Sequence, residues 1–250
     1  MTLKLAATLD GRTAAADGSS RWITGPEARA DAHRLRAGHD AVLVGAGTVR
    51  VDDPALTVRD AEGPDPLRVV LGTAPATARV HPAIEMSGPL ALILDDLGAR
   101  GVLSVLVEGG ATVAHRFHHE GLVDRYVLYL APALMGGDDG RPLLAGSGAP
   151  TIGELWRGRL ADVQRLGADL RVDLVAADAP GAVGPVRGAD GLLESPAAPD
   201  LAEARSACSR ASWRSWVACA GERTGASSST RRRSVTTCGS AIRSPTTACA

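Results

Sequence analysis

Lysine is nearly absent from this sequence. Of its 27 lysine and arginine residues, 26 are arginine, and the single lysine is Lys4. Arginine stays charged and presents a wide planar fork, whereas lysine offers a compact ammonium whose pKa falls on burial. Because the chain otherwise uses arginine for positive charge, the exception at Lys4 favours a chemical task, such as proton donation or carbonyl polarisation. A lysine that snorkels from a strand end is the simpler alternative.

Cysteine is absent before Cys208. The chain has four cysteines, all near its end, and their spacings match neither a metal knuckle nor a disulfide framework. His118 and Glu120 resemble half of a zinc-deaminase motif, but no Pro-Cys-x-x-Cys follows, and the solvent face of a helix explains them better. The sequence therefore predicts no metal site.

Long apolar runs are also missing. No stretch approaches the roughly 20 apolar residues of a membrane-spanning helix, and the first residues lack the basic-then-apolar layout of a signal peptide. A hydrophobic content of 45% and a net charge of −1 are typical of an ordinary soluble protein. We therefore expect a cytoplasmic protein with no nucleic-acid or membrane partner.

Apolar runs alternate with helical patterns along most of the chain. They predict a first strand that closes on Asp10 and Gly11, and further strands at residues 41–45, 67–71, 102–108, 125–130, 160–166 and 170–174. Helices are predicted from a capping box at Thr24 to about Arg36, and at residues 90–97 and 113–120. The alternation indicates an α/β fold with a mostly parallel sheet, whose site should lie at the carboxyl ends of the strands.

Small and acidic residues follow these strands. Gly45 to Thr48 would let a ligand or another backbone approach closely, and Glu108 to Thr112 passes directly into a helix. A strand, a glycine pair and a helix N-terminus can cradle phosphate, because unpaired N–H groups and the helix dipole face the anion. A Gly-Gly alone is weak evidence. Asp52 and Asp53 form an acidic turn, and adjacent acids are most often solvated.

Several motifs together resemble one family, over roughly residues 3–175. They are Leu-Lys-Leu-Ala-Ala-Thr-Leu-Asp-Gly-Arg, Trp22-Ile-Thr24, Gly47-Thr-Val, Asp52-Asp-Pro-Ala-Leu-Thr-Val-Arg59, Val107-Glu-Gly-Gly-Ala-Thr, and the stretch from Leu-Val-Asp124 to Leu-Ala-Pro132. In combination they resemble the reductase domain of the bifunctional riboflavin-biosynthesis deaminase/reductase. The resemblance implies a dihydrofolate-reductase-like fold, a homodimer, and reduction by NADPH of the ribose of 5-amino-6-(5-phosphoribosylamino)uracil.

The resemblance also implies roles for particular residues. The residues around the reacting ribose carbon would be Lys4, Asp52 and Glu108. Those that bind the substrate and its phosphate would be Ser20, Arg36, Leu56 and Arg59. Those that contact the cofactor would be Ala6, Trp22, Thr48, Gly109, Gly110, Ala111 and Thr112. Two arginines suit a phosphate monoester, and a lysine suits a carbonyl or imine that accepts hydride.

Two departures from the family pattern affect the prediction. The chain begins where the family's deaminase domain would have ended, so we expect no deamination. The stretch from Gly72 to Gly88 is shorter and more loop-like, which affects the adenosine end of the cofactor site. A related reductase with another phosphorylated substrate, or an inactive nucleotide-binding fragment, are the alternatives.

Beyond about Val175 the composition changes to Ala, Gly, Pro, Ser, Thr and Arg, with few aliphatic clusters. We therefore predict a reductase domain at 1–176 and a disordered tail without a site at 177–250. The tail can be back-translated so that a start codon overlaps Ala207 and Cys208. The shifted frame then resembles the opening of riboflavin synthase, which suggests an out-of-frame tail. An ordinary basic tail is the alternative.

Overall fold

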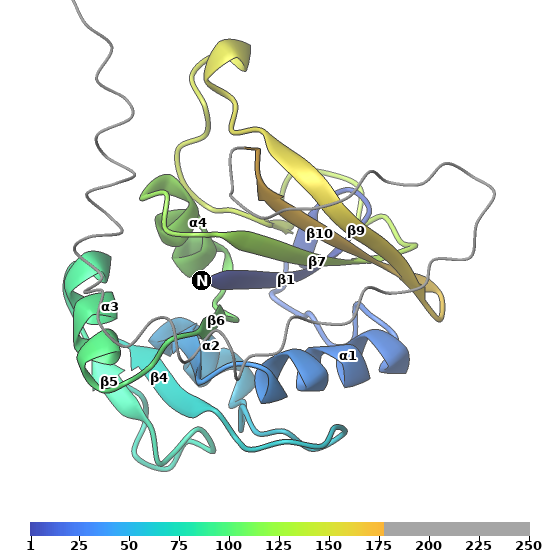
Figure 1. Cartoon of the computed structure of the whole chain (residues 1–250). Helices are drawn as coiled ribbons and strands as arrows, with labels where there is room; N and C mark the ends of the chain where they lie inside the picture. Colours follow the sequence, from blue (N-terminus) through green and yellow to red (C-terminus); the bar gives the residue numbers. More distant parts are fainter. Residues whose placement is uncertain (178–250) are drawn as a thin grey trace, which may run out of the picture. The chain divides into compact units, whose positions relative to one another are not determined.

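The computed structural model describes residues 1–177 (Figure 1). Its elements in chain order are β1 (Thr2–Thr8), β2 (Arg12–Ala14), α1 (Pro26–Ala37), β3 (Ala41–Gly45), α2 (Ala46–Asp52), β4 (Leu67–Leu71), β5 (Ile84–Met86), α3 (Leu90–Ala99), β6 (Val105–Val107), α4 (Ala111–His119), β7 (Arg125–Ala131), β8 (Arg141–Pro142), the 3-10 helix η1 (Ile152–Glu154), β9 (Gly158–Leu166) and β10 (Asp169–Ala176). The predicted tail, with its cysteines and its proposed shifted frame, lies outside the described residues.

One sheet of eight strands organises the described chain, in the order β5-β4-β3-β6-β1-β7-β10-β9. The six strands from β5 to β7 are parallel, and β10 and β9 add an antiparallel hairpin at one edge. The predicted α/β class with a mostly parallel sheet is therefore confirmed. The carboxyl ends of β3, β6 and β1, three neighbouring strands, lie at one edge of the sheet.

The two faces of the sheet carry separate apolar cores, because successive strand residues point to opposite faces. On one face, Leu3 and Leu43 pack with side chains from α3 and α4. On the other face, Val44 and Tyr129 pack with side chains from α1 and α2. The strands are thus covered on both sides, as a parallel sheet requires.

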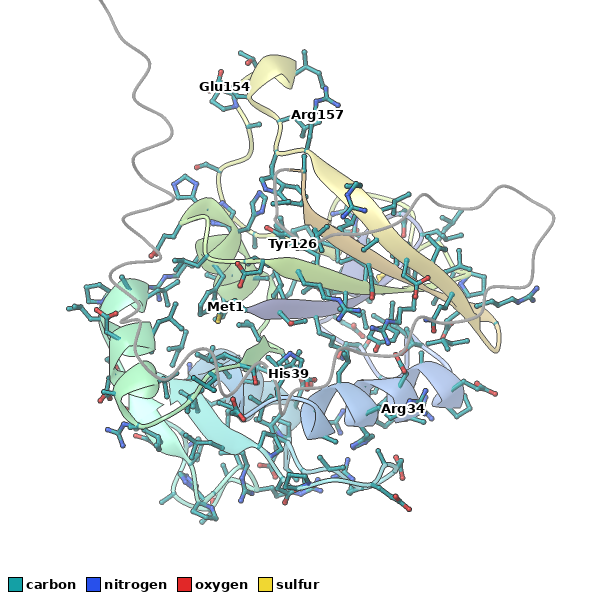
Figure 2. All side chains as sticks on the ribbon, viewed as in Figure 1. Met1, Arg34, His39, Tyr126, Glu154 and Arg157 are labelled. Carbon is teal, nitrogen blue, oxygen red and sulfur yellow. The ribbon has the colours of Figure 1, made fainter. Side chains whose placement is uncertain are left out.

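The amino end of β1 is fixed from two directions. The Met1 ammonium lies 2.5 Å from the Asp124 carboxylate, and His39 Nε2 lies 3.0 Å from Thr2 Oγ1. The other ring nitrogen of His39 lies 2.6 Å from the carbonyl oxygen of Leu35 in α1. Figure 2 shows Met1 and His39 together beside the start of this strand. These contacts set the position of β1, and hence of Lys4, relative to α1.

The prediction of a Thr24 capping box is wrong. Gly25 is the N-cap of α1 and makes no side-chain cap, and Pro26 takes the first helical position. The N–H of Gly25 instead donates to the Asp169 carboxylate at 2.6 Å. The start of α1 is therefore held by β10, a partner distant in sequence that no local motif reveals.

The predicted strand at residues 102–108 is too long, because β6 contains only Val105–Val107. The Asp40 carboxylate accepts hydrogen bonds from the backbone N–H groups of Leu103 and Ser104, at 3.0 and 2.9 Å. These bonds draw the preceding residues out of the strand. The remaining predicted strands and helices agree with the structure to within a few residues.

Three short strands and one helix were not predicted. β2 pairs with β8, and β5 extends the sheet beside β4 in a stretch predicted as loop. Gly45 to Thr48, for which only a close approach of a ligand or backbone was predicted, leads into α2, which ends at Asp52. Strands of two or three residues are too short for a periodic pattern to reveal.

Candidate active site

The centre of the site is an ion cluster between β1, β6 and α1. The parallel register pairs Leu3 with Val107, so Lys4 lies beside Glu108, the residue that follows β6. Lys4 Nζ is 3.6 Å from Glu108 Oε2. The Arg36 guanidinium, from α1, donates two hydrogen bonds to the same carboxylate, at 2.6 and 2.9 Å. One buried carboxylate therefore faces two cations.

This arrangement keeps Glu108 ionised. Burial by itself would raise the pKa of the Glu108 carboxyl, but the neighbouring Lys4 ammonium and Arg36 guanidinium outweigh it and lower that pKa to about 2. Burial would likewise lower the pKa of Arg36, and the Glu108 carboxylate reverses the effect and raises it. At neutral pH Glu108 is therefore a carboxylate and cannot donate a proton.

An aromatic ring lies beside the ammonium. Lys4 Nζ is 5.7 Å from the centroid of the Tyr129 ring, within the range of a cation–π contact. The Tyr129 hydroxyl donates to Asp31 at 2.6 Å, and Arg171 donates to the same carboxylate at 2.7 Å. Burial and the Asp31 carboxylate raise the pKa of Tyr129, so its hydroxyl stays neutral. The ring is therefore held in place beside the Lys4 ammonium.

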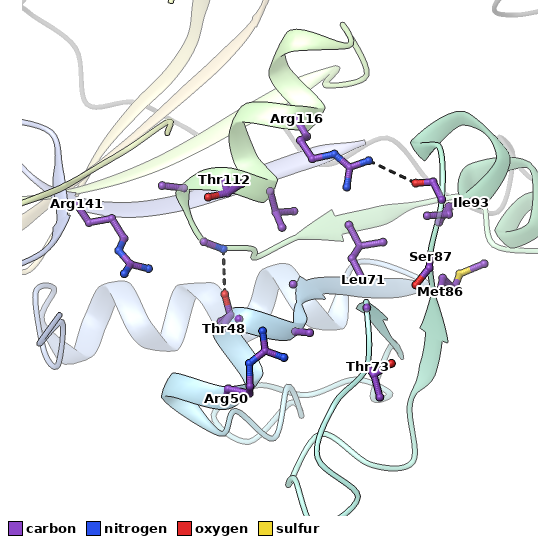
Figure 3. Close-up of a pocket in the computed structure, with 18 residues that line it drawn as sticks. Thr48, Arg50, Leu71, Thr73, Met86, Ser87, Ile93, Thr112, Arg116 and Arg141 are labelled. Carbon is purple, nitrogen blue, oxygen red and sulfur yellow. Dashed lines mark hydrogen bonds between the residues drawn. The ribbon is translucent and has the colours of Figure 1, made fainter. Parts of the chain in front are cut away.

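Two cavities lie on either side of Gly110 and Ala111, and Lys4 lines the smaller one. The smaller, about 100 Å³, is lined by Lys4, Leu5, Ala6, Thr13, Glu108, Gly109, Gly110 and Ala111. The larger, about 550 Å³, shares Gly110 and Ala111 with it and is shown in Figure 3. The small cavity thus lies against the Lys4 ammonium, and residues that follow β3 and β6 line the large one.

The wall between the cavities is a glycine-rich helix start. Gly110 is the N-cap of α4, and its N–H donates to Thr48 Oγ1 at 3.1 Å. A Cβ atom on Gly109 would lie 2.6 Å from Val113 Cγ1, so the close turn requires glycine there. The predicted strand, glycine pair and helix N-terminus are therefore present here, and their binding of phosphate stays a prediction.

The larger cavity is positively charged. Arg50, Arg116 and Arg141 line it, and of the described residues that line it none is acidic. Figure 3 shows Arg141 and Arg116 on opposite sides, with Arg116 directed towards the Gly88 carbonyl, to which it donates at 3.4 Å. A cavity of this kind suits a long anionic ligand such as a dinucleotide, because arginine pairs with phosphate through charge-assisted hydrogen bonds.

The structure brings together only part of the predicted site. Lys4, Ala6, Thr48 and the Glu108 to Thr112 loop surround the two cavities, with Arg36 behind Glu108. Besides Arg36, the predicted residues that line neither cavity are Ser20, Trp22, Asp52, Leu56 and Arg59. Their assignment to the substrate or cofactor stays a prediction.

Two of these outer residues have defined surroundings. Trp22 is 70% exposed, and the Arg29 guanidinium lies 4.5 Å from its ring centroid, so the ring is braced from α1. Asp52 ends α2, and its carbonyl oxygen accepts a hydrogen bond from Arg21. Both residues are thus connected to the loop between β2 and α1.

Sequence reasoning missed Tyr129, Arg50, Arg116 and Arg141. Tyr129 lies beside Ala6 through the pairing of β7 with β1, and register between distant strands has no local signal. The three arginines are ordinary surface charges by sequence, in a chain that uses arginine throughout.

Among residues 1–177 no group of three His, Cys, Asp or Glu side chains could hold a metal ion. No helix in that part of the chain is both long and apolar enough to cross a membrane.

The fold defines an α/β protein with two cavities at the carboxyl edge of a parallel sheet, where proteins of this class bind their ligands. Residues 1–172 match the family described as RibD C-terminal domain, and the chain belongs to this family. The predicted family is therefore confirmed, and the chain is homologous to the reductase portion of RibD, an oxidoreductase.

Two curated relatives illustrate the similarity. The chain is 43% identical over 190 residues to the riboflavin biosynthesis protein RibD of Mycobacterium tuberculosis, with 70% of this chain and 54% of the relative covered. It is 32% identical over 218 residues to RibD of Escherichia coli K12, with 70% and 59% covered. The chain thus spans somewhat more than half the length of these relatives.

Solved structures share the fold. Acinetobacter baumannii RibD, form 2, superposes with a TM-score of 0.64 at 33% identity, covering 70% of this chain and 56% of that one. The Thermotoga maritima diaminohydroxyphosphoribosylaminopyrimidine deaminase/5-amino-6-(5-phosphoribosylamino)uracil reductase gives a TM-score of 0.62 at 30% identity, covering 70% and 56%.

Proposed function

We propose that the chain is an NADPH-dependent reductase that converts the ribose of 5-amino-6-(5-phosphoribosylamino)uracil into a ribityl chain. The observation that carries the proposal is the Lys4–Glu108 pair, 3.6 Å apart, in a small cavity that shares Gly110 and Ala111 with a larger arginine-lined one. The named activity of the Thermotoga maritima relative supports the choice of substrate.

The residues fit the cofactor that the family implies. The glycine-rich start of α4 would hold its pyrophosphate, and the 550 Å³ cavity has room for its adenosine end. When bound, NADPH supplies the hydride. We further propose that Arg116 recognises the 2′-phosphate, because an acidic side chain that would bind a free ribose 2′-hydroxyl is missing from the described lining.

The protein's part in the chemistry follows from the ion cluster. The ribosylamine must open to an imine at the ribose carbon before that carbon can accept hydride. Lys4 would donate a proton to the imine nitrogen and so increase the electron demand of the carbon. Glu108, held ionised by its two cations, would keep the Lys4 ammonium in place, and the Tyr129 ring would support it from the side.

Steady-state turnover tests the proposal. The full chain is mixed with NADPH and the phosphoribosylamino substrate, the loss of reduced nicotinamide is followed by absorbance, and the ribityl product is identified by mass. We expect turnover with the chain as it is and almost none with Lys4→Gln. Arg165→Gln, which removes one positive charge from an exposed position of β9, is the matched control and should be fully active. NADPH binding without any oxidation would instead indicate an inactive nucleotide-binding fragment.

The assembly and the domain boundary stay proposals as well. We propose a homodimer, which sedimentation of the purified chain tests.

We also propose that residues 1–176 form the reductase domain, because β10 ends at Ala176 and completes the sheet. A chain truncated after Ala177 should keep the turnover of the full chain, and a loss of folding or activity would contradict this boundary.

A further inference from the structure

The segment that carries Leu56 and Arg59 is held in an unusual backbone conformation. It follows α2 and runs without a regular strand or helix from Asp53 to Asp60. Leu56 is buried and has a φ angle of 54°, and Asp53 has a φ angle of 40°. Residues other than glycine rarely adopt this left-handed region, because their backbone is strained there. Contacts from outside the segment must therefore hold it.

Helix α1 provides those contacts through two residues one turn apart, His33 and Arg36. Arg36 Nη1 donates to the Thr57 carbonyl oxygen at 3.2 Å. The backbone N–H of Arg59 points at His33 Nδ1 across 3.3 Å. His33 Nε2 lies 3.4 Å from the Asp60 carboxylate. Three successive parts of the segment are thus attached to one helix face.

Two donors and one acceptor face Nδ1 of His33, so its hydrogen bonds depend on where the ring carries its proton. Nδ1 faces the Arg59 N–H and also lies 3.4 Å from Arg36 Nη1, whereas Nε2 faces a carboxylate. A neutral ring with its proton on Nε2 donates to Asp60 and accepts from the Arg59 N–H. The Thr57 oxygen, 3.1 Å from Nδ1, keeps the hydrogen bond from Arg36 in this arrangement. Burial and then the Arg36 guanidinium lower the pKa of His33, so the ring is neutral at neutral pH.

We infer that His33 is a positioning residue that fixes the backbone of Arg59 and so aims the Arg59 guanidinium at the substrate phosphate. The inference rests on the proposed function for the identity of the anion. The Arg59 side chain is exposed, so its direction depends on its backbone. Because Arg36 on the same helix holds both Glu108 and Thr57, α1 also fixes the distance between the reacting end of the site and the Arg59 segment.

Two substitutions separate this role from simple packing. In His33→Asn, the side-chain oxygen can occupy the place of Nδ1 and accept the Arg59 N–H. In His33→Leu, no acceptor remains. Since one hydrogen bond contributes about 1 kcal/mol, we expect His33→Leu to raise KM for the phosphorylated substrate about fivefold to tenfold with little change in kcat or in KM for NADPH. His33→Asn should stay close to the unaltered chain.

A double-mutant cycle tests the path through Arg59. In a His33→Leu background, Arg59→Ala should raise KM by a smaller factor than it does in the unaltered chain, because the guanidinium is no longer aimed. Equal factors in both backgrounds would overturn the inference. Three results with the single variants would also overturn it. The first is a KM that is raised equally in His33→Asn and His33→Leu, and the second is an unchanged KM in His33→Leu. The third is a parallel loss of kcat and of NADPH affinity in His33→Leu.

Hydrogen exchange gives a readout that needs no activity. The amide of Arg59 should exchange faster in His33→Leu than in the unaltered chain, and His33→Asn should restore slow exchange. Exchange that is the same in all three proteins would overturn the anchoring of Arg59. If the unaltered chain does not reduce the pyrimidine substrate, the proposed function fails, and the exchange experiment still decides whether His33 holds this segment.

Discussion

Glu108→Gln tests the electrostatics of the ion cluster directly. The two cations lower the pKa of Glu108 from its ordinary 4.5 to about 2. A difference of about 2.5 in pKa corresponds to about 3 kcal/mol of folding free energy. Glutamine keeps the shape of the side chain but cannot ionise, so the variant should be about 3 kcal/mol less stable at neutral pH.

The sign of the pH dependence follows from the lowered pKa. The carboxylate's contribution is fully present above pH 4.5 and is lost as the pH falls towards 2, where the folded protein also takes up the proton. The difference in free energy of unfolding between the unaltered chain and Glu108→Gln should therefore disappear between about pH 5 and pH 2. Urea unfolding followed by circular dichroism at several pH values measures this difference.

Glu62→Gln is the matched control for this experiment. Glu62 is exposed in the loop before β4, so its substitution should change stability little at any pH. If the free energy of unfolding differs between the unaltered chain and Glu108→Gln by the same amount at every pH, packing and not charge causes the difference. No gap at neutral pH would show that the cluster does not stabilise the fold.

The remaining predictions concern turnover and ligand binding. Lys4→Arg should lower kcat at least a hundredfold, on the order expected for a lost general acid, while NADPH titration by fluorescence gives a similar Kd; near-normal kcat would make Lys4 structural. Arg59→Ala should raise KM only for the phosphorylated substrate, which a dephosphorylated substrate checks. Arg36→Ala should also lower kcat, because it removes the partner of Glu108; an effect on KM alone would contradict this. Arg116→Ala should lower the preference for NADPH over NADH, measured as the ratio of their kcat/KM values, about tenfold, the size of one phosphate contact. An equal fall in kcat/KM with both cofactors would exclude a 2′-phosphate contact.

Sequence reasoning was strongest where local pattern and fold class agree. The strands that end at Gly45 and Val107 have continuous apolar runs, which only a sheet covered on both faces buries. Their parallel order brings both ends to one edge, as predicted. The uniqueness of Lys4 likewise indicated a special position, and the structure places it in the strand next to Glu108.

Interactions between distant elements could not be predicted. The bidentate bond from Arg36 to Glu108 depends on how α1 lies across the sheet, and the fixing of Tyr129 by Asp31 and Arg171 depends on the pairing of β7 with β10. Each of these residues is an ordinary charged or aromatic residue in the sequence. Their partners follow from register and helix placement, for which no local periodicity exists.

The position of Arg36 changes how its predicted phosphate role must be understood. Its Nε and Nη2 donate to Glu108 and its Nη1 donates to Thr57, so most of its donors already have partners within the chain. A guanidinium in that state can contribute charge to a nearby phosphate but has few hydrogen bonds left to give. The exposed Arg59 has the freedom that Arg36 lacks. Under the proposed function, the two arginines that look equivalent by sequence therefore have different tasks: Arg36 fixes the geometry from α1, and Arg59 would bind the anion.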